Sequence, residues 1–183
     1  MSAKTNVTAQ EALKRLQDGN ERYLTAATPA GDVSKARREE TTQNGQHPYA
    51  VIVTCSDSRV IPESVFSAGI GELFVVRSAG NTIGAGELGS VEYAVGHLGC
   101  PLTVVMGHTH CGAVDAAMHG GGEGHVKPIT DEIQKAIGNE PDADRACVLN
   151  VRQSVSILRR ELPEGAEILG AVYHIDDGRV EFL

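Results

Sequence analysis

Residues 49–55 read YAVIVTC, a continuous apolar run rich in β-branched side chains. Such a run is typical of a strand that is covered on both faces, as the strands of a parallel sheet are. Two similar runs follow at residues 73–76 and 102–106, and between them residues 87–98 carry apolar side chains on one helical face. This alternation predicts βαβ units with right-handed crossovers and a parallel sheet.

The segments on either side extend this pattern. Residues 8–23 predict an amphipathic N-terminal helix, and the polar residues 24–47 predict a linker with one short helix at 33–41. The glycine-rich segment GGGEG predicts a loop after the third strand. Two further helices are expected at 128–139 and 144–162, and a final pair of strands at 168–175 and 179–182. The predicted fold class is α/β: a central, mostly parallel sheet of about four strands flanked by helices, with an N-terminal helical arm and a C-terminal edge strand.

Composition and charge limit the classes of protein to which the chain can belong. With 183 residues, 41% of them hydrophobic, we expect one domain over 1–183, with 1–47 as arm and linker and 48–183 as the α/β core. A net charge of −8 argues against nucleic acid or an anionic membrane as a partner. The absence of an apolar segment long enough for a membrane span or signal peptide predicts a cytoplasmic protein. The four scattered cysteines predict reduced thiols.

Three side chains with the chemistry of zinc ligands fall at predicted strand ends. Cys55 ends the first strand, His108 ends the third, and Cys111 follows three residues later. Because the carboxyl ends of parallel strands meet at one edge of a sheet, we expect these side chains to converge. Zinc prefers thiolate and imidazole ligands, and a set of two cysteines and one histidine leaves the fourth position for water or substrate. The alternative is that both cysteines are buried core thiols.

Asp57 and Arg59 follow Cys55 within one turn and place a carboxylate and a guanidinium beside this site. Arg59 can pair bidentately with Asp57 and hold it ionised. Asp57 could then orient a metal-bound hydroxide, or it could bind the metal itself; the alternative is an ordinary surface salt bridge. Because two thiolates reduce the positive charge on the metal, we expect activity at such a site to rise with pH.

Together these motifs resemble the β-class carbonic anhydrases. The matching segments are ALKRLQDGNERY (12–23), CSDSRV (55–60), ELFVVRSAGN (72–81), SVEYAVGHLG (90–99), GHTHCGAV (107–114) and GAVYHIDDGRVEFL (170–183). The resemblance implies reversible hydration of carbon dioxide to bicarbonate and a proton by zinc-bound hydroxide, oriented by Asp57 and Arg59. It also implies a single Zn²⁺ in each subunit, held by Cys55, His108 and Cys111. As partners it implies a homodimer or dimer of dimers, in which the arm embraces a second subunit and the active sites form at the interface.

The resemblance further implies a substrate pocket. Gln46 matches a residue that binds the substrate or bicarbonate oxygen, and the backbone of Gly112 is expected beside the metal. The apolar wall of the carbon dioxide pocket is matched by Phe74, Ala79 and Tyr93, with Ala79 smaller than the valine common at its position. For Phe74 and Tyr93, plain core packing explains the residue type equally well. For Gln46 the alternative is a solvated loop residue.

The chain departs from the family pattern, and its residues are compatible with two other functions. Members regulated by bicarbonate carry a tryptophan where this chain has Ile52, and the chain contains no tryptophan. Arg77 matches the arginine of that regulatory site and is expected here to serve structure. Two other functions remain open: hydrolysis of carbon disulfide, for which enzymes share this scaffold, and a non-catalytic zinc protein in which Asp57 closes the fourth position.

Overall fold

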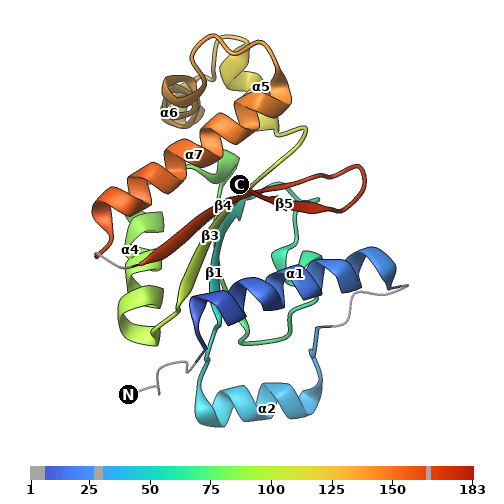
Figure 1. The fold of residues 1–183 in the computed structure, drawn as a ribbon. Coiled ribbons are helices and arrows are strands. Elements are labelled where there is room, and N and C mark those ends of the chain that lie inside the picture. Colours follow the sequence, from blue (N-terminus) through green and yellow to red (C-terminus); the bar gives the residue numbers. More distant parts are fainter. Residues whose placement is uncertain (1–6, 27–30, 164–165) are drawn as a thin grey trace.

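A five-stranded sheet in the order β2-β1-β3-β4-β5 runs through the centre of the computed structural model (Figure 1). The strands are β1 (Ala50–Cys55), β2 (Leu73–Ser78), β3 (Leu102–His108), β4 (Glu167–Tyr173) and β5 (Val180–Phe182). The first four are parallel, and β5 pairs antiparallel with β4 at the edge. This arrangement confirms the predicted α/β fold with a mostly parallel sheet and a C-terminal edge strand.

The structure describes residues 7–26, 31–163 and 166–183. Residues 27–30 of the expected linker and residues 1–6 of the expected arm lie outside this range. The helices are α1 (Ala9–Thr25), α2 (Lys35–Asn44), α3 (Pro62–Val65), α4 (Ala85–Tyr93), α5 (Gly112–Met118), α6 (Lys127–Ile137) and α7 (Ala143–Glu161). Over the described residues, no helix has the length and apolar character that crossing a membrane requires.

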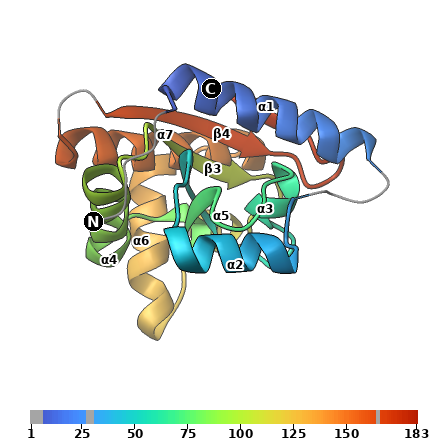
Figure 2. The ribbon, with the colours of Figure 1, turned by 90° about the horizontal axis from the view of Figure 1, so that it is seen from below.

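The side chains of β1 alternate between two apolar layers. Val51 and Val53 pack in a cluster with residues of α4 and α7, whereas Ala50 and Ile52 pack in a cluster with residues of α1 and α3. Figures 1 and 2 show α1 and α4 on opposite sides of the sheet. By the same alternation Cys55 points to the side of Val53, where it joins an apolar cluster formed with α5, α6 and α7. The strand is buried on both faces, as its sequence predicts.

Several observed boundaries differ from the predicted ones, and local hydrogen bonding explains two of them. The helix expected at 87–98 is α-helical only to Tyr93, after which Ala94–Leu98 form a π-helical turn that ends at Gly99 in the left-handed conformation. The strand expected at 168–175 ends at Tyr173, because His174 already belongs to the hairpin turn and its carbonyl accepts a hydrogen bond from the Gly178 amide. These details depend on local hydrogen bonds that apolar periodicity does not report.

Helix α1 packs closely against the core of its own chain. Thr8 caps its first turn, accepting a hydrogen bond from the Glu11 amide, while the Glu11 carboxylate accepts one from the Thr8 amide. Leu16 is fully buried, and a Cβ atom at Gly19 would lie 2.0 Å from the Phe66 carbonyl oxygen. The helix therefore approaches the chain after α3 so closely that only glycine fits at the contact.

We predict that the substitution G19A destabilises the protein although alanine is normally the better helix former. The added methyl group has to displace the backbone at Phe66, which should lower the free energy of unfolding by about 1–3 kcal/mol. The matched control is G89A in α4, where a Cβ atom would meet nothing within 4 Å; there we expect a gain of about 0.5–1 kcal/mol. Urea unfolding of both variants checks this, and equal effects would contradict the close contact.

Candidate metal centre

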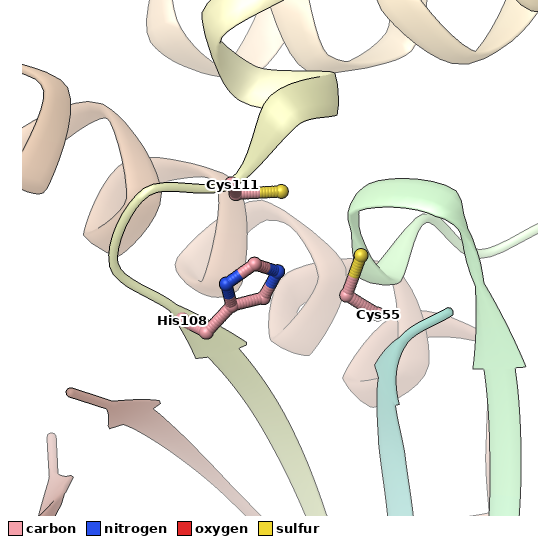
Figure 3. A group of neighbouring side chains, drawn as sticks. All are labelled: Cys55, His108 and Cys111. Atoms are coloured by element: carbon pink, nitrogen blue, oxygen red, sulfur yellow. The ribbon is translucent and has the colours of Figure 1, made fainter. Parts of the chain in front are cut away.

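The carboxyl ends of β1 and β3 bring the three predicted ligands together. Cys55 ends β1, His108 ends β3, and Cys111 lies at the N-cap of α5. Their ligand atoms all lie within 4.8 Å of one another, and Figure 3 shows the two sulfur atoms and the imidazole ring facing the same space. All three side chains are buried. The predicted convergence of these residues is therefore confirmed.

The hydrogen bonding of His108 fits a metal ligand. Its Nδ1 lies 2.8 Å from the Thr109 carbonyl oxygen, which can only accept, so Nδ1 carries the proton and Nε2 presents a lone pair. Nε2 is buried and has no hydrogen-bond partner among the described residues. An unpaired buried nitrogen of this kind costs about 1–3 kcal/mol. Zn²⁺ bound between Nε2 and the two sulfurs would remove this cost with the ligand types that zinc prefers.

The two thiols are arranged so that one ionises much more easily than the other. A hydrogen bond from Cys111 lowers the pKa of Cys55, and hydrogen bonds from the amides of Gly80 (3.2 Å) and Asp57 (3.4 Å) to its sulfur act in the same direction. The neighbouring Cys55 sulfur in turn raises the pKa of Cys111. A divalent cation bound to both sulfurs would favour the thiolate form of each. The site is thus prepared to hold at least one thiolate before a metal arrives.

Asp57 and Arg59 form the predicted bidentate pair at the rim of this site. Arg59 Nη2 donates to Asp57 Oδ2 at 2.7 Å and Arg59 Nε donates to Oδ1 at 3.0 Å. Hydrogen bonding from Arg59 holds the pKa of Asp57 well below its usual range, so that the carboxylate stays ionised. Asp57 Oδ2 lies 4.0 Å from His108 Nε2, too far for a hydrogen bond but within the same space.

Two arginines fix the loop that carries Cys55 and Asp57. Arg59 Nη2 also donates to the His110 carbonyl at 3.1 Å, which ties the loop after β1 to the loop after β3. Arg77, on β2, donates to the carbonyl oxygens of Cys55 (3.2 Å), Asp57 (2.7 Å) and Val60 (2.8 Å). The structural role expected for Arg77 is therefore that of a clamp on the backbone of residues 55–60.

Within one chain, two of the expected substrate residues lie next to the metal ligands and the others lie farther away along the strands. Gly112 directly follows Cys111, and Ala79 follows Ser78, which pairs with Cys55 in the β1–β2 register. Phe74 instead pairs with Val51, four residues before Cys55 and about 13 Å away along the strand. The Tyr93 ring lies 6.2 Å from the Phe74 ring, and its side chain is exposed.

Gln46 belongs with Phe74 and Tyr93. It precedes β1, and its Cα lies about 4.0 Å from the position that a Cβ on Gly71, just before β2, would occupy. Gln46 is therefore at the amino ends of these strands, whereas the metal ligands are at the carboxyl ends. One chain by itself does not bring Gln46, Phe74 and Tyr93 to its own metal centre.

A cavity of about 440 Å³ lies elsewhere, between α7 and the β4–β5 hairpin. Thr109, Leu149, Arg152 and Leu183 are among the residues that line it, but Cys55, His108 and Cys111 are not. It is therefore not the space that the metal ligands face.

Comparisons with known proteins point to one family. Residues 50–180 match the family model described as carbonic anhydrase. Carbonic anhydrase 2 of Mycobacterium tuberculosis is 35% identical over 192 residues, covering 95% of this chain and 92% of the relative. The carbonic anhydrase of Mycolicibacterium smegmatis is 36% identical over 188 residues, covering 93% and 91%. A tetrameric β-carbonic anhydrase from Sordaria macrospora has the same fold, with a TM-score of 0.69, 22% identity and coverage of 81% and 91%.

We predict that the purified protein contains about one zinc ion per chain and that C55S loses most of it, because serine does not replace a thiolate as a zinc ligand. The matched control is C100S. Cys100 is also buried, but its thiol donates to the Pro48 carbonyl at 3.3 Å and burial raises its pKa to about 12. Metal analysis of the three proteins checks this, and full zinc retention in C55S would contradict the ligand assignment.

Proposed function

Because the chain belongs to the β-class carbonic anhydrase family, we propose that it catalyses the reversible hydration of carbon dioxide to bicarbonate and a proton. The observation that carries this proposal is the buried group of Cys55, His108 and Cys111, whose ligand atoms lie within 4.8 Å of one another. Beside it stands an ionised carboxylate, Asp57, held by Arg59. The site therefore combines three metal ligands with a carboxylate that can accept a hydrogen bond from the hydroxyl group that attacks carbon dioxide.

The three ligand residues prepare the site for its metal. When bound, Zn²⁺ supplies a Lewis acid that lowers the pKa of a water molecule, so that hydroxide becomes available near neutral to mildly alkaline pH. The Thr109 carbonyl fixes the His108 tautomer and ring orientation, and the Gly80 and Asp57 amides direct the lone pairs of Cys55. These contacts hold the ligands in place before substrate arrives, which reduces the cost of organising the site.

Asp57 is proposed to orient the attacking oxygen. Held ionised by Arg59, it has no proton to donate and can only accept a hydrogen bond. By accepting one from the attacking hydroxyl group, Oδ2 would aim a lone pair of that oxygen at the carbon of carbon dioxide. The engagement of both Asp57 oxygens by Arg59 also supports an open fourth metal position, as opposed to a site that Asp57 closes.

We predict that stopped-flow hydration of carbon dioxide accelerates as the pH rises from about 7 to 9, since two thiolates leave the metal's water less acidic than at a site of three histidines. D57A should retain zinc but lose about 100-fold in rate at every pH. The pKa of Asp57 is shifted downward, so this carboxylate is already ionised throughout the range and its titration does not contribute to the rise.

The control for this experiment is R38A on α2. Among the described residues, the Arg38 guanidinium donates to the carbonyl of Val33, an exposed residue. A wild-type rate in zinc-loaded D57A would refute the role of Asp57. A zinc-loaded wild type that hydrates no carbon dioxide at any pH would refute the proposed function. Hydrolysis of carbon disulfide is measured on the same samples. Turnover of carbon disulfide without hydration of carbon dioxide would favour the alternative enzyme activity.

The substrate pocket is proposed to be completed by a second chain. β2 is an edge strand, and Phe74 on it and the exposed Tyr93 beside it lie far along the strand from the metal ligands. A twofold axis next to β2 would set the amino end of one chain's β2 beside the carboxyl end of the other's. Gln46, Phe74 and Tyr93 of one chain would then face the metal centre of its partner. The β-carbonic anhydrase of the same fold from Sordaria macrospora is tetrameric, so chains of this fold are known to associate.

We predict that two inactive variants restore activity when they share a dimer. H108A removes a metal ligand and Q46A removes the proposed substrate contact, so each homodimer should be nearly inactive. In a heterodimer one site would combine the intact metal ligands of the Q46A chain with the intact Gln46 of the H108A chain. Heterodimers purified through two different tags should therefore show about half the wild-type activity. If Gln46 acted within its own chain, the heterodimer would stay inactive.

A further inference from the structure

The chain makes an unusual turn directly after β2. Gly80 and Asn81 both have positive φ angles, of 64° and 47°, a conformation that glycine and asparagine tolerate better than other residues. A Cβ atom on Gly80 would lie 2.7 Å from Ile133 Cδ1 and 3.0 Å from Ala113 Cβ. This turn is what brings the Gly80 amide to 3.2 Å from the sulfur of Cys55.

Two side chains of α7 hold the turn in place. Asn150 Nδ2 donates to the Gly80 carbonyl at 2.8 Å, and Ser154 Oγ donates to the Asn81 carbonyl at 2.9 Å. Asn150 and Ser154 are each 2% exposed and stand four residues apart, on the same face of the helix. Buried carbonyls require partners, and these two side chains supply them. The α7 helix therefore supports the turn by hydrogen bonds as well as by apolar packing.

We propose that Asn150 is a positioning residue for the metal centre, acting through Gly80 on Cys55. Asn150 fixes the carbonyl of the same residue whose amide donates to the Cys55 sulfur, so it limits the rotation that would turn this amide away. The packing of α7 on the sheet is provided by neighbouring apolar residues such as Val151, Val155 and Leu158. The polar contact of Asn150 is thus directed at the turn. This inference rests on the proposed metal centre.

The hydrogen bond from Gly80 matters because it acts on a metal ligand. An amide that donates to a thiolate withdraws charge from the sulfur and fixes the direction of its remaining lone pairs. Partners of this kind commonly change metal affinity by about 10- to 100-fold when they are removed. Loss of the Asn150 side chain should therefore be detectable in metal binding, even though Asn150 touches neither the metal nor substrate.

The test compares N150A, S154A and S156A. Ser156 is exposed on the same helix, so S156A is the matched control for S154A. Each protein is loaded with Co²⁺, whose thiolate-to-metal charge-transfer band reports the electron density on sulfur, and the Zn²⁺ dissociation constant is measured by chelator competition. Circular dichroism and thermal unfolding verify the fold. We expect N150A to bind Zn²⁺ about tenfold or more weakly and to shift the cobalt band, S154A to show smaller changes, and S156A to match the wild type.

A folded N150A with the wild-type dissociation constant and cobalt spectrum would overturn the proposal. If N150A does not fold, N150S replaces it, because serine is too short to keep the hydrogen bond to the Gly80 carbonyl. An unchanged dissociation constant and cobalt spectrum in folded N150S overturn the proposal equally. A wild-type protein without a thiolate-to-cobalt band would reject the metal centre and this inference with it. A wild type that shows the band but does not hydrate carbon dioxide would instead reject the proposed function, while the role of Asn150 would still be decided by the variants.

Discussion

The parallel pairing of β1 with β3 is the constraint on which the site depends. Val53 pairs with Val105 and Thr54 with Met106, so both strands run toward the same edge of the sheet, where β1 ends at Cys55 and β3 at His108. A one-residue slip in register would turn every side chain of β1 to the opposite face of the sheet, break the packing of both apolar layers and carry Cys55 away from His108. The burial that stabilises the sheet therefore also fixes the metal ligands.

The polar groups around the ligands are organised from three directions. Arg77 reaches across from β2 to the backbone that carries Cys55 and Asp57, and Arg59 connects this backbone to the loop after β3. From α7, Asn150 supports the turn that faces the Cys55 sulfur. Such contacts restrict the ligand loops before a metal or substrate binds. Preorganisation of this kind is how a protein strengthens electrostatic interactions without reorganising at the moment of reaction.

In one chain the metal ligands and three of the proposed substrate residues lie at opposite ends of the strands next to the open edge at β2. Metal ligands gather at the carboxyl ends of the strands, while Gln46, Phe74 and Tyr93 lie toward the amino end of β1 and β2. A strand of six residues spans roughly 20 Å, so no side chain can bridge the two ends. In the proposed twofold association along this edge, opposite ends of two chains would meet, and the oligomeric state would decide whether the pocket is complete.

The amino-acid sequence was enough to predict the sheet strands, the main helices and the convergence of Cys55, His108 and Cys111, because burial patterns and the meeting of parallel strand ends follow general rules. It also predicted the pairing of Asp57 with Arg59, since these residues are two positions apart. Three relations are visible only in the folded chain: Arg77 clamps the ligand loop, Asn150 holds Gly80, and Gln46 lies far from its own metal centre. Those relations join segments distant in sequence through strand register and helix packing, which no local pattern of residue types encodes.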